Sequence, residues 1–328
     1  MTSPDPVALF GCKSTTRFLL DALLDRGLGV TLVTIAPAKG AEQEVADYTD
    51  LRAYGAGRGV DVYVAERYSL RSDRDRAFFR DRSFALGFVI GWQRLVPAEV
   101  LATFSTGVFG MHGSAMGLPR GRGRSPMNWS LIEGRRSFRT HLFRYAPGAD
   151  DGDLLDGHTF AITDRDTAET LHFKNTLAMK MLVERNLPAL LAGTARPVPQ
   201  PQGTPTYYPK RFPADSLIDW HDDLHAIDRH IRAVAPPFNG AYTYLHGTRL
   251  SILRAAPFST DDFGYSATPG TVVTVFPGGK FLVQCFGGLL LVHAYSPATP
   301  PDPGMLLTTG PEALRRFPRN AQGYFDLP

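Results

Sequence analysis

The first third of the chain alternates short apolar runs with segments that carry apolar residues at helical spacing. The runs at residues 7–11, 29–35 and 60–64 have the length and composition of buried β-strands. Residues 15–24, between the first two runs, begin with a threonine pair that suits a helix N-terminus. Because parallel strands need a crossover connection, this alternation predicts an open, mainly parallel α/β sheet. Such a sheet binds its ligand beyond the carboxyl ends of its strands.

The last third of the chain has a different pattern. Residues 195–209 are rich in proline, glycine, glutamine and threonine, which predicts a linker. Between residues 243 and 297 short apolar runs are punctuated by glycine, as in a small β-barrel. A chain of 328 residues is long enough for two cores. We therefore expect two domains, residues 1–200 and 201–328, the second of them β-barrel-like.

Two later segments have the spacing of helices. Residues 167–187 are predicted to form a long helix that ends before Pro188. A second, amphipathic helix is expected around His221, Asp222 and His225, which together mimic a helical metal-binding pair. No third ligand is evident in the sequence, so we expect no metal site.

Composition narrows the class of protein. Hydrophobic residues make up 43% and charged residues 20%, as in a soluble globular protein. The net charge of +3 is small for a nucleic-acid-binding protein of this size. Two cysteines, Cys12 and Cys285, are too few and too far apart for a disulfide framework or a zinc site. The first apolar run is too short for a signal peptide or a membrane span, so we expect a cytoplasmic protein without membrane association.

The stretch over residues 109–153 has the composition of a catalytic site. It places His112 in a glycine-rich approach and closes on an Asp-Asp-Gly-Asp turn that begins at Asp150. An imidazole that titrates near neutrality can take a proton from a nucleophile, and a carboxylate partner fixes its tautomer and stabilises its charged form. His112 and Asp150 are therefore the candidate catalytic pair. The arginine/glycine run at residues 120–124 lacks flanking aromatic residues, which favours a solvated loop over an RNA-binding tract.

This stretch resembles the catalytic region of the formyltransferases that use 10-formyltetrahydrofolate, the group of methionyl-tRNA formyltransferase and the sugar-nucleotide N-formyltransferases. The family pattern reads roughly Asn-x-His-x-Ser-Leu-Leu-Pro, then Arg-Gly, Pro-x-x-Trp and Asp-x-Gly. The matching residues, in the same order, are His112, Ser114, Arg122-Gly123, Pro126, Trp129 and Asp150-x-Gly152. The resemblance covers nearly the whole chain and is strongest over residues 88–153. It implies a Rossmann-like sheet followed by a β-rich C-terminal domain.

The resemblance also implies catalytic roles. In the family the histidine assists proton transfer and, with an asparagine two residues before it, holds the formyl oxygen as it becomes an oxyanion. Here His112 would take the first role, oriented by Asp150, but the asparagine position falls on Gly110, which offers only its backbone N–H. Losing one oxyanion donor costs ~10²–10³ in rate. Either another group substitutes, with Asn128 as one candidate, or the reaction has changed.

Other site residues follow from the same resemblance. Residues 84–96 resemble the family segment that forms the slot for the pterin ring, so 10-formyltetrahydrofolate is the expected formyl donor. The candidate donor contacts are Trp92, Arg94, Leu95, Pro97 and Asp150. The candidate acceptor contacts are Ser114, Arg122 and Asn128. Lys13, which follows the first strand, is a further candidate because an open sheet binds its ligand beyond the carboxyl ends of its strands, with an exposed lysine in a turn as the alternative.

The acceptor is expected to be a small molecule. Residues 36–58 are polar and lean acidic, whereas family members that act on tRNA carry a basic insertion near here. Binding tRNA should need basic side chains that neutralise phosphates. A small-molecule amine, such as an amino sugar nucleotide or a modified amino acid, free or presented on a carrier, is therefore favoured over methionyl-tRNA.

Two other functions stay open at this point. Gly110 is compatible with an enzyme on the same scaffold that hydrolyses the formyl donor or transfers a different one-carbon group. A non-catalytic folate-binding protein is the third reading, and it predicts tight folate binding without turnover. The presence of both His112 and Asp150 argues against that reading, because a silent binder does not need the pair.

Overall fold

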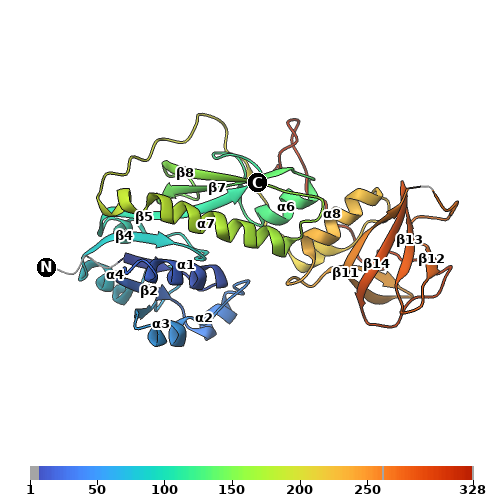
Figure 1. Cartoon of the computed structure of the whole chain (residues 1–328), viewed down its shortest axis with the longest axis horizontal. Helices are drawn as coiled ribbons and strands as arrows, with labels where there is room; N and C mark the ends of the chain where they lie inside the picture. Colours follow the sequence, from blue (N-terminus) through green and yellow to red (C-terminus); the bar gives the residue numbers. More distant parts are fainter. Residues whose placement is uncertain (1–6, 261, 327–328) are drawn as a thin grey trace. The chain divides into compact units, whose positions relative to one another are not determined.

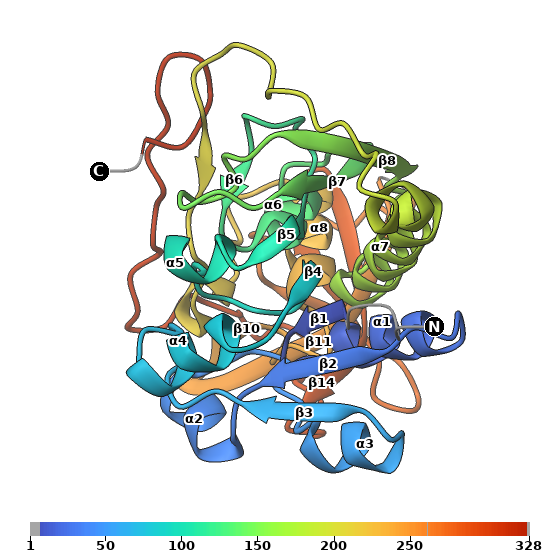
Figure 2. The ribbon, with the colours of Figure 1, turned by 90° about the vertical axis from the view of Figure 1, so that its left-hand side faces the viewer.

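A seven-stranded sheet in the order β3-β2-β1-β4-β5-β7-β8 organises the computed structural model, which describes residues 7–260 and 262–326. Figure 2 shows this succession from β3 at the bottom to β8 at the top. The first five strands in this order run parallel, and β7 runs antiparallel to β5. The strands are β1 (Val7–Phe10), β2 (Val30–Thr34), β3 (Asp61–Val64), β4 (Phe84–Val89), β5 (Phe104–Ser114), β7 (Ser137–Arg144) and β8 (Leu154–Ala161). The predicted open, mainly parallel α/β sheet is confirmed.

Helices cover both faces of this sheet. On one face α1 and α7 pack their leucines against the strands, and α3 lies at the same face; α4 and α5 lie on the other (Figure 2). Burial of these leucines, valines and phenylalanines on the two faces is the main stabilising term for such a layered fold. The helices are α1 (Ser14–Leu24), α2 (Pro37–Glu42), α3 (Arg52–Gly57), α4 (Asp73–Arg80), α5 (Ala98–Leu101) and α7 (Ala168–Leu191).

Helix α7 does not end where the sequence pattern predicted. It continues through Pro188 to Leu191, so the expected stop before this proline is wrong. Proline removes one backbone donor and crowds the preceding turn. Here it lies in the last turn, and the N–H of Ala192 still donates to the Pro188 carbonyl at 3.0 Å. The packing of Leu187 and Leu190 in the core stabilises this turn despite the lost hydrogen bond.

The C-terminal part contains a second, antiparallel sheet in the order β10-β11-β14-β13-β12 (Figure 1). Helix α8 (Leu224–Val234) packs its apolar face on this sheet through Ile227 and Ile231. Residues 306–308 form bridges to Thr271 and Tyr244, which lie at the two edges of the sheet. This closure agrees with the predicted β-barrel-like domain. The strands are β10 (Ala241–Leu245), β11 (Thr248–Ser259), β12 (Val272–Val275), β13 (Phe281–Cys285) and β14 (Gly288–Ser296).

The described residues divide into two units that alternate along the chain. The first comprises residues 7–122, 139–159 and 174–205, and the second comprises the rest. The second unit therefore includes α6 (Pro126–Ile132), β9 (Tyr207–Tyr208) and the 3₁₀ helix η1 (Pro213–Ser216), while β6 (Arg122–Gly123) lies where the chain passes from one unit to the other. The domain boundary expected at residue 200 stays a prediction.

Two further findings concern the cysteines and membrane-spanning helices. Cys12 and Cys285 are both free and buried. Among the residues that the structure describes, no helix combines the length and apolar character needed to cross a bilayer.

Candidate functional site

Strand β5 carries the central histidine of the site. Side chains alternate along a strand, so Gly110, His112 and Ser114 share one face of β5. The His112 side chain is 9% exposed, and its Nδ1 lies 3.3 Å from Oδ2 of Asp150, whose side chain is 22% exposed. On the other side of the ring, Nε2 lies 2.7 Å from the carbonyl oxygen of Gly121. The structure thus brings His112 and Asp150, the predicted pair, together.

Both ring nitrogens of His112 face oxygen acceptors. A neutral imidazole has one N–H and can donate to only one of them, whereas imidazolium donates to both. When the neutral ring donates from Nε2 to Gly121, the lone pair on Nδ1 faces the carboxylate of Asp150. The arrangement therefore matches the hydrogen-bonding capacity of imidazolium, and it suits a step in which His112 carries a proton.

The hairpin between β7 and β8 fixes the position of Asp150. Its φ is +53°, a left-handed conformation that aspartate adopts more readily than most residues. A Cβ on Gly152 would lie 1.7 Å from the carbonyl oxygen of Arg144, so glycine is needed for this close approach. The N–H of Arg144 donates to the carbonyl of Asp153 at 2.8 Å and closes the hairpin. These constraints give the Asp-x-Gly pattern its physical reason.

A glutamine that the sequence pattern did not indicate supports the same hairpin. Nε2 of Gln200 donates to the carbonyl oxygens of Asp150 at 2.7 Å and of Gly152 at 2.9 Å. Its Oε1 accepts a hydrogen bond from Nη2 of Arg122 at 2.8 Å. Arg122, a predicted acceptor contact, is buried and holds Gln200, so its role toward an acceptor stays a prediction. Gln200 lies in the segment predicted as a linker, where no local signal distinguishes it.

An aromatic side chain occupies the space beside Gly110. A Cβ on Gly110 would lie 1.9 Å from Cε2 and 3.0 Å from Cζ of Tyr145. Tyr145 is held there by its backbone N–H, which donates to the carbonyl of Val108 at 2.7 Å, and its ring stacks on Phe143 with centroids 5.5 Å apart. Position 110 therefore cannot carry a side chain while Tyr145 keeps this place. No local sequence pattern had pointed to Tyr145.

A second histidine lies opposite the first. In the antiparallel pairing of β5 with β7, His141 is the partner of His112, and directly opposed residues share one face of a sheet. Burial, with smaller contributions from the charges of Arg139 and His112, lowers the pKa of His141 to about 4. His141 is thus uncharged at neutral pH, and its buried Nδ1 has no hydrogen-bond partner among the described residues. It too was missed, because register is not readable from local pattern.

Comparison with known families decides which proteins this chain is related to. The family model described as "Formyl transferase" matches residues 7–185, and the model "Formyl transferase, C-terminal domain" matches residues 211–300. The first match alone covers more than half of the chain. This chain belongs to the formyltransferase family.

Several solved structures share the fold of this chain. The N-formyltransferase from Helicobacter canadensis, in complex with folinic acid and dTDP-3-aminofucose, is 16% identical, with 89% of this chain and 99% of that chain covered and a TM-score of 0.65. WlaRD, a sugar 3N-formyl transferase crystallised with dTDP and 5-N-formyl-THF, is 15% identical, with 90% and 98% covered and a TM-score of 0.65. A HypX variant from Aquifex aeolicus is 17% identical, with 89% of this chain but 44% of HypX covered and a TM-score of 0.63. At these identities the likeness shows the fold alone.

The candidate folate contacts in this member of the family differ in exposure. Trp92 is buried, with its ring against Phe10 and Tyr68, and its Nε1 has no hydrogen-bond partner among the described residues. Nη2 of Arg94 donates to Oε1 of Gln43 at 2.7 Å. Two further candidates, half-exposed Leu95 and buried Pro97 at the start of α5, follow in the same loop. Their contacts with folate stay predictions.

The remaining predicted acceptor contacts make local structure. Oγ of Ser114 donates to the carbonyl of Met116 at 2.6 Å and accepts from the N–H of the same residue, which shapes the turn after β5. Lys13 directly precedes α1, and its backbone forms a bridge with Tyr48. Asn128 lies in the second unit, where its amide donates to the carbonyl of Ala233 at 2.7 Å. Their roles toward an acceptor stay predictions.

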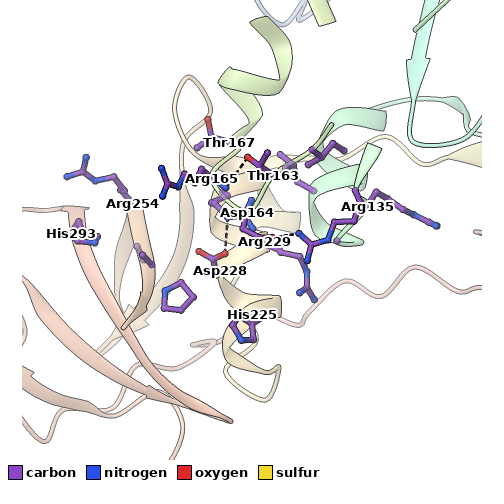
Figure 3. A pocket seen from close by; sticks show the side chains of 18 residues that line it. Arg135, Thr163, Asp164, Arg165, Thr167, His225, Asp228, Arg229, Arg254 and His293 are labelled. Carbon is purple, nitrogen blue, oxygen red and sulfur yellow. Dashed lines mark hydrogen bonds and ion pairs between the residues drawn. The ribbon is translucent and has the colours of Figure 1, made fainter. Parts of the chain in front are cut away.

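The second unit of this formyltransferase contains a cavity of about 890 Å³ with a basic lining (Figure 3). Its walls come from α6 and the turn after it, the loop between β8 and α7, helix α8, and strands β11 and β14. Six arginines and two aspartates line it, which leaves an excess of four positive charges, whereas the whole chain has a net charge of +3. We call it the arginine pocket; its charged residues are Arg135, Arg136, Arg165, Arg229, Arg232, Arg254, Asp164 and Asp228.

Proposed function

We propose that this member of the family is an N-formyltransferase that moves a formyl group from 10-formyltetrahydrofolate to the amine of a small molecule. The contact between Nδ1 of His112 and Oδ2 of Asp150, at 3.3 Å, carries the proposal. It places a group that can hold a proton next to a carboxylate that stabilises its charged form. The carboxyl end of β5, where this pair lies, is also where open parallel sheets bind their ligands.

The loop after β4 fits a flat heterocycle such as the pterin of a folate. The buried Trp92 Nε1–H lacks an acceptor among the described residues, and a pterin edge offers acceptors. Leu95, with 49% of its surface exposed, offers hydrocarbon for a ring face. When bound, the donor supplies a formyl carbon that the amine attacks; the carbonyl π pair moves to oxygen, and the bond from that carbon to the folate nitrogen then breaks.

His112 and Asp150 move the proton that this exchange requires. The amine nitrogen loses one proton as it becomes an amide, and the folate nitrogen gains one as it leaves, so the transfer is balanced without an external acid. His112 accepts the first proton and returns the second, while Asp150 stabilises the intervening imidazolium. The contact between Nε2 of His112 and the Gly121 carbonyl oxygen, at 2.7 Å, must break before Nε2 can accept a proton from the amine.

An amino sugar nucleotide or a modified amino acid, free or carrier-bound, is the proposed acceptor class. The structure of the N-formyltransferase from Helicobacter canadensis contains dTDP-3-aminofucose, and WlaRD is described as a sugar 3N-formyl transferase. Both support an amino sugar nucleotide as the acceptor. The segment at residues 36–58 is acidic, with Glu42, Glu44, Asp47 and Asp50. Such a segment does not favour binding of tRNA phosphates there.

Formylation assays test the proposal. The full chain is incubated with 10-formyltetrahydrofolate and a panel of amines that includes amino sugar nucleotides, and products are read by the mass of one added formyl group. We expect His112→Gln to abolish transfer, and His158→Gln on β8 to leave it unchanged as the matched control. Unchanged transfer in the His112 variant would refute the catalytic role.

An incubation without amine distinguishes a second candidate function, hydrolysis of the formyl donor, from formyl transfer. A glycine at position 110, in place of the family's asparagine, favours altered chemistry such as hydrolysis of the formyl donor. Formate released from the donor in the absence of any amine, at a rate above the uncatalysed one, would support hydrolysis over transfer.

A further inference from the structure

We infer that the hydroxyl of Tyr145 donates the second hydrogen bond to the oxygen that becomes negatively charged during formyl transfer. The inference rests on the proposed function, because it names a further catalytic group for that reaction. Gly110 and His112 share one face of β5, and the ring of Tyr145 occupies the side-chain position of residue 110 on that face. Tyr145 and His112 therefore border the same space.

The phenol has the protonation state and the freedom that a donor needs. Burial, and after it the negative charge of Asp150, raises the pKa of Tyr145 well above its ordinary value, so the hydroxyl keeps its proton at neutral pH. Tyr145 is half-buried, and its hydroxyl has no hydrogen-bond partner among the described residues. The group is thus available to a ligand oxygen, and it acts by hydrogen bonding alone, without losing its proton.

Gly110 and Tyr145 depend on each other sterically. A side chain at position 110 would collide with the ring of Tyr145 at 1.9 Å, so the two cannot occupy the space together. The ring is locked by stacking on Phe143 and by the backbone bond to Val108, which removes the need to order it when substrate binds. Donors that are fixed in advance stabilise developing charge most effectively.

The test compares Tyr145→Phe with wild type under formyl-transfer conditions. Phenylalanine fills the same space but cannot donate, so a space-filling role predicts unchanged turnover. We expect kcat to fall on the order of 10²-fold, with KM changed by less than about threefold, because the lost bond forms only as charge develops. Tyr54→Phe, which removes a hydroxyl that contacts Asp21, is the matched control and should keep wild-type kcat. Equal kcat in Tyr145→Phe and wild type overturns the inference.

A swap experiment asks whether position 110 and position 145 share one donor place. In Tyr145→Ala the space is empty, and adding Gly110→Asn supplies an amide donor from the strand. We expect this double variant to recover at least about tenfold of the kcat lost in Tyr145→Ala; no recovery would count against a shared place. Failure of the proposed function looks different, because wild type would then transfer no formyl group to any amine. Thermal unfolding curves confirm that each variant is folded.

Independently, the geometry points to a second site: the arginine pocket binds a phosphorylated small molecule through its phosphate groups. Several of its arginines are already engaged. Arg232 pairs with Asp228 at 2.8 Å, Arg136 with Asp164 at 2.5 Å, and Arg135 with Glu133, outside the lining, at 2.9 Å. Arg165 has no side-chain hydrogen bond or ion pair among the described residues.

Arg254 is free in the same sense, and its charge helps, after burial, to lower the pKa of His293 on the neighbouring strand β14. Positive charge in excess of its protein partners is stabilised by an anion from solution. Guanidinium groups suit phosphate because their planar forks donate two parallel hydrogen bonds. The two free arginines, Arg165 and Arg254, line the cavity from separate elements, the loop between β8 and α7 and strand β11 (Figure 3).

The size of the cavity favours a small ligand over nucleic acid. A volume of about 890 Å³ lies within the range of small-molecule sites, roughly 300–1,000 Å³. Nucleic-acid binding calls for basic residues that extend along a face, with phosphates contacted at successive positions. A diphosphate group, with its concentrated negative charge, matches the positive charge that the three ion pairs of the arginine pocket leave uncompensated.

Calorimetric titration of the full chain with inorganic pyrophosphate at low salt tests the pocket. We expect binding that weakens about tenfold or more in the double variant Arg165→Gln and Arg254→Gln, both of which replace exposed side chains. Arg71→Gln, an exposed arginine in the first unit, is the matched control and should bind as wild type does. Absence of pyrophosphate binding, or equal binding in the double variant, overturns the assignment. Binding of a short RNA that depends on the two arginines, while pyrophosphate fails to bind, would overturn it in favour of nucleic acid.

Discussion

The site on β5 and the arginine pocket differ in their balance of positive and negative side chains. At the first, His112 faces one carboxylate, and the neighbouring His141 is kept uncharged by burial. At the second, six arginines face two aspartates, and Arg165 and Arg254 have no partner side chain among the described residues. In the proposed reaction, the first gains and loses a charge on His112. The second carries a permanent excess of positive charge, which an anionic ligand would neutralise.

Because of this difference, the two regions need different degrees of support from the residues around them. A site that moves a proton needs its geometry fixed to within fractions of an ångström, and here the hairpin at Asp150, Gln200 and Arg122 supply that support. A site that attracts an anion needs mainly the right sum of charges, so single contacts in the arginine pocket matter less. Substitutions should therefore have large and specific effects in the first region and small, additive effects in the second.

The comparison predicts its largest effect for Asp150→Asn. The amide keeps the shape of the side chain but cannot stabilise imidazolium, and it can offer an N–H to the ring in place of an acceptor. We expect kcat for formyl transfer to fall by roughly 10²–10⁴-fold. Steady-state rates with the best amine of the panel measure this. The neighbouring Asp151→Asn, at an exposed position, is the control, and a loss below about threefold in Asp150→Asn would contradict the proposed pairing.

The sequence predicted the parts of the first region that local pattern encodes. The strand and helix alternation placed β1, β2 and β3 correctly, because burial of apolar runs decides those elements. The spacing of residues in the motif pointed to His112 and Asp150, which the structure brings within 3.3 Å. The stop expected at Pro188 failed because tertiary packing of the last turn outweighs one lost hydrogen bond.

The parts that sequence reasoning missed depend on contacts between distant segments. Tyr145 meets Gly110 only when β5 and β7 pair, and His141 meets His112 only in the register of that pairing. Gln200 reaches Asp150 from a segment whose composition predicts a linker. The arginine pocket takes its residues from five separate elements, so its charge is invisible to any window along the chain.

A second prediction concerns the exclusion of charge near the catalytic pair. The pKa of His141 is lowered to about 4, below the unfolded value of about 6.5, so the unfolded chain binds more protons between these values. The stability contributed by neutral His141 is thus full above pH 6.5 and is lost as pH falls toward 4, by about 3 kcal/mol in all. Urea unfolding between pH 4.5 and 7.5 should show this slope, and His141→Asn should flatten it.

The second unit supplies a matched control for that measurement. Burial, with help from the charge of Arg211, lowers the pKa of His230 to about 4 as well, so His230 adds to the slope with the same sign as His141. His230→Asn should remove its own share of the slope without affecting formyl transfer. A slope that is unchanged in both variants would show that neither histidine is kept neutral by folding.

The smallest effect is expected for Asp164→Asn, which increases the charge excess of the arginine pocket. Asp164 is exposed and pairs with Arg136, and exposed ion pairs are worth about 0–1 kcal/mol, so its removal costs little stability. Loss of its negative charge frees Arg136 for the ligand, and we expect pyrophosphate to bind about two- to fivefold tighter at low salt. The gain should shrink at high salt, because screening weakens interactions between exposed charges. Asp25→Asn in the first unit should leave the dissociation constant unchanged. Weaker binding in Asp164→Asn would show that the pocket does not act through its sum of charges, and the contrast with the catalytic pair would then fail.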